Sequence, residues 1–240
     1  MADHKTAERL AVEEVAVAPH STVKPMLVKP KRSTWYHLKV SQGGNLLFII
    51  TSLPPVLRLT AEVAQDAKLT IVLAAATDHK AAFSSTVKLV GTGARALEQM
   101  GVVGTKESEF ELETVLEHCV PHTFGRIISR RVQQDSSFGI LRGLLRVAPG
   151  ALGTDTYLSD KALLVGAKAR GLSVPSLEIL ADDVKASHGA TVGQLSPDEL
   201  FYVQSRGVTR PAAEELLIRA FLEPALSNMP DEFKLNALRF

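Results

Sequence analysis

The amino-acid sequence predicts an all-β body followed by a small helical region, on three observations. Many runs of five to eleven residues are rich in Val, Leu and Ile and are bounded by Gly, Asp, Asn, Pro or Ser, as strands are. Convincing amphipathic helices between these runs are scarce, which disfavours an alternating strand–helix layout. After residue 193 the pattern changes to strong helix-start signals.

The expected strands cover 45–51, 56–63, 68–75, 85–90, 109–116, 125–132 and 139–149. Polarity alternates in several of them, so that Arg58, Thr60 and Glu62 share one face. The groups recur every ~20–25 residues, which suits a parallel β-helix whose coils stack on one another. A β-sandwich with strands every ~8–12 residues is the competing architecture. Composition alone does not separate the two.

The helical region is expected over 194–240. Ser196 can cap a first helix, with Pro197 at its first position and Glu199 completing a capping box. Gly207 ends this helix, and Thr209 can cap a second one over 211–222. That second helix carries an apolar stripe formed by Leu216, Leu217, Ala220 and Phe221. A third helix is expected over about 231–238.

Ahead of the β body, which is expected over 33–193, residues 1–32 are expected to form an N-terminal arm. The stretch 18–32 contains three prolines and several like charges, which disfavour a regular element.

Length and charge limit the class of protein. The 240 residues suit one large domain, and 27 basic against 26 acidic residues give no whole-molecule field that would hold nucleic acid. Cys119 is the single cysteine, which fits a reducing compartment. The N-terminus lacks the apolar core of a secretory signal, and the longest apolar run, near 46–50, is too short to span a membrane. We therefore expect a cytoplasmic protein with no membrane contact.

One motif points to a different function. Gly91, Gly93 and Ala96 fit a GxGxxA dinucleotide fingerprint after the expected strand 85–90, with Glu111 at the distance of a ribose-binding acid. A nucleotide-dependent oxidoreductase is therefore the alternative function. We favour a Gly-bounded turn between two strands, because the motif lies mid-chain and no other strand–helix–strand unit supports it.

Two segments could supply metal ligands. Glu117, His118 and Cys119 with His122 offer nitrogen and sulfur donors, although no second cysteine exists to complete a four-ligand site. A histidine at a strand end beside a buried cysteine is the favoured interpretation. In the second segment His188 stands among small polar residues that would leave its imidazole accessible, and a packed histidine is the competing interpretation. Catalytic residues are not predicted, since no nucleophile–base motif is present.

The second segment belongs to a longer pattern. ADDVKASHGATVGQL at 181–195, LFYVQSRGV at 200–208 and AEELLIRAF at 213–221 closely resemble the C-terminal signature of the SufB/SufD family, and the SufD side is the nearer match. LEHCVPHTFGRIISRRV, GLLRVAPGALGTDTYLSDKALLVG and SLEILADDVK keep the order of that family's core segments. The resemblance covers about 85–225.

The resemblance implies both a fold and a function. It implies a right-handed parallel β-helix with C-terminal helices, acting as a non-catalytic scaffold in iron–sulfur cluster assembly. The implied partners are a SufC-type ABC ATPase, which would hydrolyse the ATP, and a SufB-like chain or a second copy. The chain is expected to be a short, core-only version without the N-terminal helical domain of longer members.

The resemblance also implies site residues. His188 falls on the histidine of the SufD-type motif, a possible metal ligand in cluster assembly, but Ala186 replaces the motif's cysteine. We therefore expect no cofactor bound stably by this chain alone, and at most a transient cluster at a subunit interface. Docking of the ATPase is assigned to the C-terminal helices, through Leu200, Phe201, Arg206, Glu214, Leu217, Arg219 and Phe221.

Overall fold

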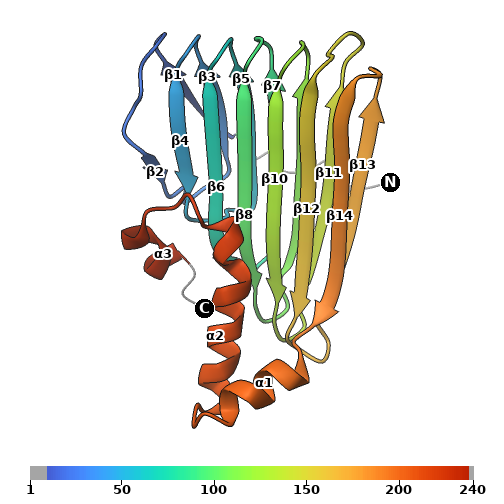
Figure 1. The fold of residues 1–240 in the computed structure, drawn as a ribbon. Coiled ribbons are helices and arrows are strands. Elements are labelled where there is room, and N and C mark those ends of the chain that lie inside the picture. Colours follow the sequence, from blue (N-terminus) through green and yellow to red (C-terminus); the bar gives the residue numbers. More distant parts are fainter. Residues whose placement is uncertain (1–9, 238–240) are drawn as a thin grey trace, which may run out of the picture.

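The strands form two stacked seven-stranded parallel sheets, between which the chain alternates (Figure 1). This computed structural model describes residues 10–237. Sheet A contains β1 (Ala11–Val17), β3 (Thr34–Val40), β5 (Val56–Val63), β7 (Ala81–Leu89), β9 (Glu109–His118), β11 (Phe138–Val147) and β13 (Arg170–Ile179). Sheet B contains β2 (Met26–Val28), β4 (Asn45–Ile50), β6 (Lys68–Thr77), β8 (Arg95–Gly104), β10 (Phe124–Gln133), β12 (Thr154–Leu164) and β14 (Val184–Gln194).

Each strand pairs only with strands of its own sheet, one coil before and one coil after it. The predicted parallel β-helix is therefore confirmed, and the β-sandwich alternative is excluded because its sheets would be antiparallel. The coils lengthen along the chain. The Thr60–His37 contact joins residues 23 apart in sequence. The Arg131–Asp160 and Arg146–Glu178 contacts join residues 29 and 32 apart, beyond the expected repeat.

The arm prediction needs correction. Residues 1–9 lie outside the described residues, but β1 pairs in parallel with β3 and β2 pairs with β4, so the segment 11–28 forms the first coil. The prolines do not disrupt these strands, because Pro19, Pro25 and Pro30 all lie in the segments that precede or follow them.

The dinucleotide interpretation is wrong. Gly91 and Gly93 lie in the turn between β7 and β8, and the residues that follow form a strand in sheet B, where the fingerprint requires a helix. Packing of adjacent coils accounts for the glycines. A Cβ at Gly91 would overlap the backbone nitrogen of Gln65 in the preceding coil. Gly93 has a φ of +77°, and a Cβ there would overlap the Asp66 carboxylate.

The interior between the sheets is apolar in the early coils. Phe48, Leu57, Leu59, Ile71 and Leu73 are among its largest fully buried side chains. Apolar burial of this extent is the main driving force for folding, at roughly 25 cal/mol per Å². From β8 onward, polar side chains increasingly enter the interior.

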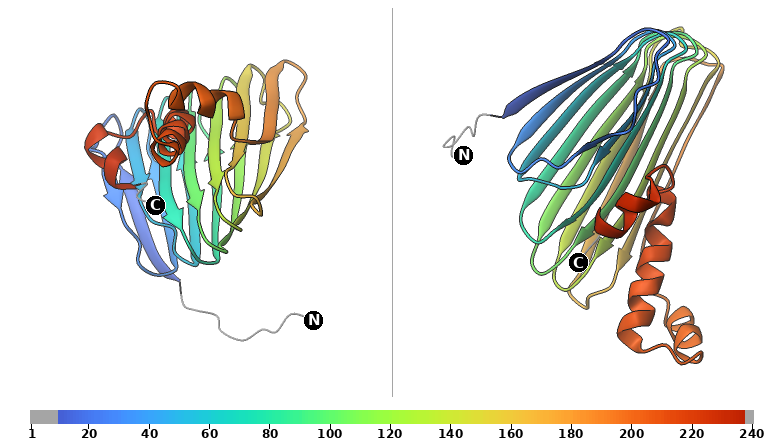
Figure 2. Two further views of the ribbon diagram at one scale, coloured as in Figure 1. Left: turned by 90° about the horizontal axis from the view of Figure 1, so that it is seen from below. Right: turned by 90° about the vertical axis from the view of Figure 1, so that its left-hand side faces the viewer.

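The C-terminal helices cover part of the outer face of sheet B, as both views in Figure 2 show. They are α1 (Pro197–Gln204), α2 (Arg210–Leu222), the 3-10 turn η1 (Glu223–Ala225) and α3 (Asp231–Ala237). The predicted Ser196 cap is present, because its hydroxyl accepts a hydrogen bond from the Glu199 N–H. None of the helices within residues 10–237 has the length and apolar character needed to cross a membrane.

The buried face of α2 differs from the expected stripe. Ala213, Ile218 and Leu222 are buried, whereas Leu216 and Ala220 point to solvent. Ile218 and Leu222 join Leu226 and Met229 in a second apolar cluster that packs on Ile49, Val72, Val103 and Val132 of sheet B. Gln99 of β8 strengthens this contact, since its amide donates to the Pro224 carbonyl and to Ser227 Oγ, both at 2.8 Å.

Candidate functional site: the open end of the solenoid and the C-terminal helices

The last coil, formed by β13 and β14, leaves one end of the solenoid open. Both strands are edge strands among the described residues. Their side chains are exposed or half-buried, whereas those of the preceding strands alternate with fully buried residues. An open edge presents unpaired backbone N–H and C=O groups, which invite pairing with another strand.

His188 stands on the interior side of this open end. Its Cα pairs in register with that of Leu158, which is fully buried between the sheets. Paired residues of adjacent parallel strands share a face, so His188 ends an inward row. The row runs through Phe48, Ile71, Glu98, Ile127, Leu158 and His188. The His188 side chain is nevertheless exposed, because the described chain adds no further coil beyond β14.

An ion pair lies one coil inside the open end. Arg131 and Asp160 are fully buried, and their side chains share two hydrogen bonds of 3.0 and 2.5 Å. Arg131 also donates to the carbonyl oxygens of Gly139 and Leu172, at 2.8 and 3.2 Å. One guanidinium therefore ties together four strands from both sheets, including the edge strand β13.

Other polar groups in the late coils lack a protein partner. The hydroxyls of Ser129, Thr156 and Ser173 and the amide of Gln133 are buried with no hydrogen bond to the protein. Buried polar groups normally have partners, so their clustering in β10, β12 and β13 sets this end apart from the apolar early coils.

Two titratable groups are also buried in the interior. Glu98 accepts hydrogen bonds from Ser85 and Thr114, at 2.5 and 2.6 Å, and burial raises the pKa of its carboxyl group despite them. His118 shares a 2.7 Å hydrogen bond with Thr123 through Nδ1. Burial, helped by the nearby positive charge of Arg126, lowers the pKa of His118 to about 4. His118 is therefore neutral at physiological pH.

The first candidate metal segment does not form a site. His118 points into the interior and Cys119 is exposed at the following corner, not buried as expected, while Glu117 forms ion pairs on the outer face of sheet A. Among residues 10–237, no three His, Cys, Asp or Glu side chains come together as metal ligands would. Cys119 also precedes β10, two strands from β14, so it cannot replace the cysteine missing at Ala186.

Some of the residues assigned to partner binding are exposed, and the others already make contacts within the protein. Phe201 is 74% exposed, and Arg206 stacks on the neighbouring Tyr202, 5.1 Å from the ring centroid. Leu200 is buried, and Phe221 packs against the second apolar cluster. Glu214 and Arg219 are held in ion pairs within α2, with Arg210 at 2.9 Å and with Glu215 at 2.7 Å, and Leu217 is half-buried.

Exposed apolar side chains on α1 and α2 extend this surface beyond the residues expected from the sequence. Tyr202 is 60% exposed and Leu216 is 53% exposed. A groove between these helices and the ends of β12 and β14 is lined by Leu195, Leu200, Phe201 and Gln204, among others. Arg206 donates to the Tyr202 hydroxyl at 3.1 Å, but it lies in the turn that follows α1, so no helical spacing in the sequence marks Tyr202.

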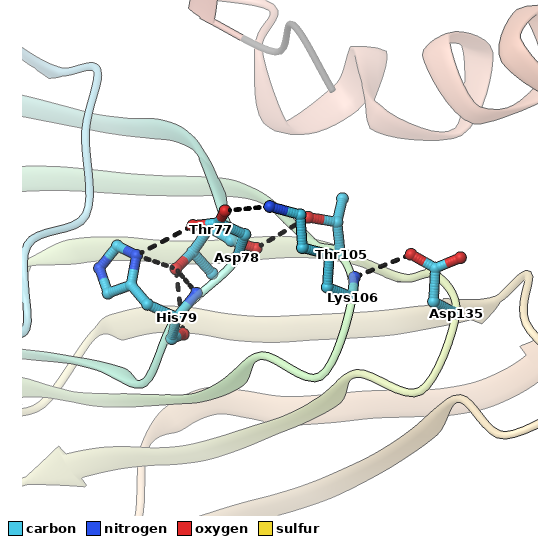
Figure 3. Close-up of polar contacts among 6 residues, drawn as sticks. All are labelled: Thr77, Asp78, His79, Thr105, Lys106 and Asp135. Carbon is cyan, nitrogen blue, oxygen red and sulfur yellow. Dashed lines mark hydrogen bonds and ion pairs between the residues drawn. The ribbon is translucent and has the colours of Figure 1, made fainter.

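A second polar cluster lies at the corners that lead from sheet B to sheet A (Figure 3). Asp78 binds the Lys106 ammonium at 2.6 Å, and the Lys106 backbone N–H donates to Asp135 at 2.8 Å. Hydrogen bonds from Lys106 and His79 lower the pKa of Asp78. These contacts join corners of successive coils, so the cluster braces the stack.

The chain is therefore a parallel β-helix protein with an open, polar-lined end and a C-terminal helical appendage. Residues 56–221 match the family described as "SUF system FeS cluster assembly, SufBD core domain". The chain belongs to this family.

Curated relatives agree with this assignment. The chain is 32% identical to the iron–sulfur cluster assembly protein SufD of Bacillus subtilis over 70% of its length and 38% of the relative's. It is 35% identical to SufD of Escherichia coli over 53% of its length and 30% of the relative's. It is 28% identical to an iron–sulfur cluster assembly SufBD family protein of Mycobacterium tuberculosis over 95% of its length and 25% of the relative's. The chain thus spans between a quarter and two fifths of each of these relatives.

Proposed function

We propose that this chain is a non-catalytic, cytoplasmic scaffold component of iron–sulfur cluster assembly that acts with a SufC-type ABC ATPase. The observation that carries the proposal is that one molecule has two exposed surfaces that no other part of the described chain covers. One is the open β13–β14 end, and the other is the exposed apolar surface of α1 and α2.

The helical surface is the proposed ATPase docking site. Phe201, Tyr202 and Leu216 expose large apolar areas, while Leu200, Ile218 and Leu222 anchor the same helices to the body. Aromatic side chains beside an arginine are typical of the residues that dominate binding energy at protein interfaces. The charges of Glu214 and Arg219 are already paired, so Phe201 and Leu216 should contribute more to docking than either charge.

The open end is the proposed site for a SufB-like chain or a second copy. Strand addition would satisfy the free edges of β13 and β14 and would cover the inward row that ends at His188. This chain would contribute one imidazole to a cluster held there in transit, and the other ligands would come from the partner, because no cysteine of this chain lies at that end.

Light scattering on a sizing column, with and without the SufC-type ATPase of the same source, tests the docking proposal. We expect co-elution with the wild-type chain and loss of it in the double variant Phe201→Ser with Leu216→Ser. Leu152→Ser is the matched control, because Leu152 is 45% exposed at a solenoid corner away from the helices. Absence of a complex with the wild-type chain would refute the proposal, as would equal loss with the control.

His188 needs a separate test. We expect His188→Ala to retain the ATPase complex but to reduce cluster formation on the assembled proteins, followed by absorbance of the iron–sulfur charge-transfer bands. Asn at the same position keeps a polar side chain without imidazole basicity, and it should not restore cluster formation. Full activity of both variants would remove His188 from the proposal.

A further inference from the structure

The outer face of sheet B beside the C-terminal helices carries a concentration of basic side chains, and Arg130 borders the helices, 6.0 Å from the centroid of the Phe221 ring. The basic strip consists of Lys68, Arg95, Arg126, Arg130, Lys161 and Lys185, which occupy outward positions on β6, β8, β10, β12 and β14. Lys68 and Arg95 are the first residues of β6 and β8, and Lys185 is the second residue of β14. These strands start in the upper part of the front sheet in Figure 1.

Acidic side chains neutralise little of the positive charge of the basic strip. Asp155 is the one acidic side chain at outward positions of β6 to β14 in sheet B, and it is paired with Arg126 at 2.8 Å. The exposed side chains of Lys68, Arg95, Lys161 and Lys185 form no ion pair within the described residues.

The outer face of sheet A provides the comparison within the same molecule. One of its rows alternates in sign across six strands, through Lys39, Glu62, Lys88, Glu117, Arg146 and Glu178. Glu117 pairs with Lys88 and with Arg146, and Arg146 pairs with Glu178. Opposite charges on adjacent strands stabilise the sheet. The basic strip lacks this arrangement, so its charge is available to a ligand.

Aromatic rings hold part of the basic strip in place. Arg126 lies 4.1 Å from the centroid of the Phe124 ring and Arg95 lies 5.4 Å from it, so one ring faces two guanidinium groups. Arg126 also donates to the carbonyl oxygens of Gly125 and Asp155, at 2.8 and 3.1 Å. Side chains restrained in this way lose less conformational entropy when a ligand binds.

We propose that the basic strip binds an acidic segment of a protein partner on the outer face of sheet B. The strip crosses five strands, and four spacings of ~4.8 Å give a length of ~19 Å. That length fits about six residues of an extended peptide at ~3.3 Å per residue. Lys68, Arg95 and Lys185 share one row across these strands, with Phe124 and Asp155 between Arg95 and Lys185. Carboxylates of the segment would pair with these basic groups.

A protein segment fits the chain better than a nucleic acid does. The whole chain has a formal net charge of +1, whereas nucleic-acid binding usually draws on a strongly basic domain. Two of the six basic groups are also committed within the protein, Arg126 to Asp155 and Arg130 to Ser159 and the Ser129 carbonyl. The remaining four suit a short run of carboxylates.

Fluorescence anisotropy with a labelled ten-residue glutamate peptide tests the proposal on the full chain. We expect saturable binding that weakens as salt increases, and a loss of at least tenfold in affinity in Arg95→Glu with Lys185→Glu. The matched control is Lys39→Glu with Arg58→Glu, which changes the net charge equally through exposed residues of sheet A and should retain wild-type affinity. Circular dichroism should show both variants folded.

Three results would overturn the proposal. They are absence of binding at low salt, equal loss of affinity in both double variants, and tighter binding of a single-stranded oligonucleotide with ten phosphates than of the peptide. The last result would assign the basic strip to nucleic acid instead.

Discussion

At the scale of single residues, the buried Arg131–Asp160 pair is the feature with the largest expected energetic effect. A buried charge that loses its partner is strongly destabilising, by about 3–5 kcal/mol, whereas replacing both charges by apolar residues often costs little. We therefore expect Asp160→Leu to lower the free energy of unfolding by about 3–5 kcal/mol. Urea denaturation followed by circular dichroism measures this change.

The double variant Arg131→Met with Asp160→Leu is the control for that prediction. It should recover most of the lost stability, because no unpaired charge remains. If the double variant is as unstable as Asp160→Leu, the role of Arg131 lies instead in its bonds to the Gly139 and Leu172 carbonyls.

His118 should make the stability of the fold dependent on pH. Its pKa falls from 6.5 to about 4 on folding, so the folded state favours the neutral ring. The resulting stability is fully present above pH 6.5 and is lost as the pH falls toward 4. The difference corresponds to about 3 kcal/mol.

Unfolding free energies measured between pH 7 and pH 4 test this expectation. The acid-dependent loss should be smaller by about that amount in His118→Leu, which has no titrating ring. His122→Asn is a suitable control, because Asn tolerates the positive φ of 57° at that exposed corner. It should retain the wild-type loss, and a variant His118→Leu that also retains it would contradict the assignment.

At the scale of elements, the two faces of α2 should differ sharply in their sensitivity to truncation. Leu222 is fully buried against sheet B, and Leu216 on the same helix is 53% exposed. We expect Leu222→Ala to destabilise the protein by about 2–5 kcal/mol and Leu216→Ala by less than about 0.5 kcal/mol. Thermal and urea unfolding of the two variants would reveal the reverse order if α2 packed through the face that the sequence indicates.

The same helix shows where sequence reasoning succeeds and where it fails. Local chemistry predicts where α2 begins, since Thr209 stands at its N-cap. The Ser196 cap and the Gly207 turn that bound the preceding α1 also depend on neighbouring residues alone. The buried face depends on the distant surface of sheet B. Leu216, Leu217, Ala220 and Phe221 form an apolar stripe by spacing, yet the fold buries Ile218 and Leu222.

The strands also show which features the sequence predicts and which it does not. Strand-like runs predict β5 and β9 to β11, whereas the prolines that flank β1 and β2 indicate an arm. The dinucleotide interpretation requires a helix after Ala96 where the structure has β8, since the sequence does not reveal that Glu98 turns inward to Ser85 and Thr114. Among the site residues, the place of His188 followed from the family resemblance, whereas Tyr202 and the basic strip became visible only from exposure and register.

At the scale of the whole molecule, stacking of coils makes stability a sum of contacts between neighbours. A coil in the middle has two neighbours and an apolar interior, whereas the last coil has one neighbour and a polar interior. The solenoid should therefore open from the β13–β14 end, which is also the end proposed to receive a partner.

Hydrogen exchange followed by mass spectrometry tests this gradient. We expect backbone amides in β6 to exchange slowly, and amides in β14 to exchange among the fastest of all the strands, because local openings govern exchange at an edge. Addition of a SufB-like partner, or a concentration that produces dimers, should slow exchange in β14 and leave β6 unchanged. Equal protection of β6 and β14 in the isolated monomer would show that the polar end is as stable as the apolar coils. It would then require the partnerless hydroxyls of Ser129, Thr156 and Ser173 to be satisfied by ordered water.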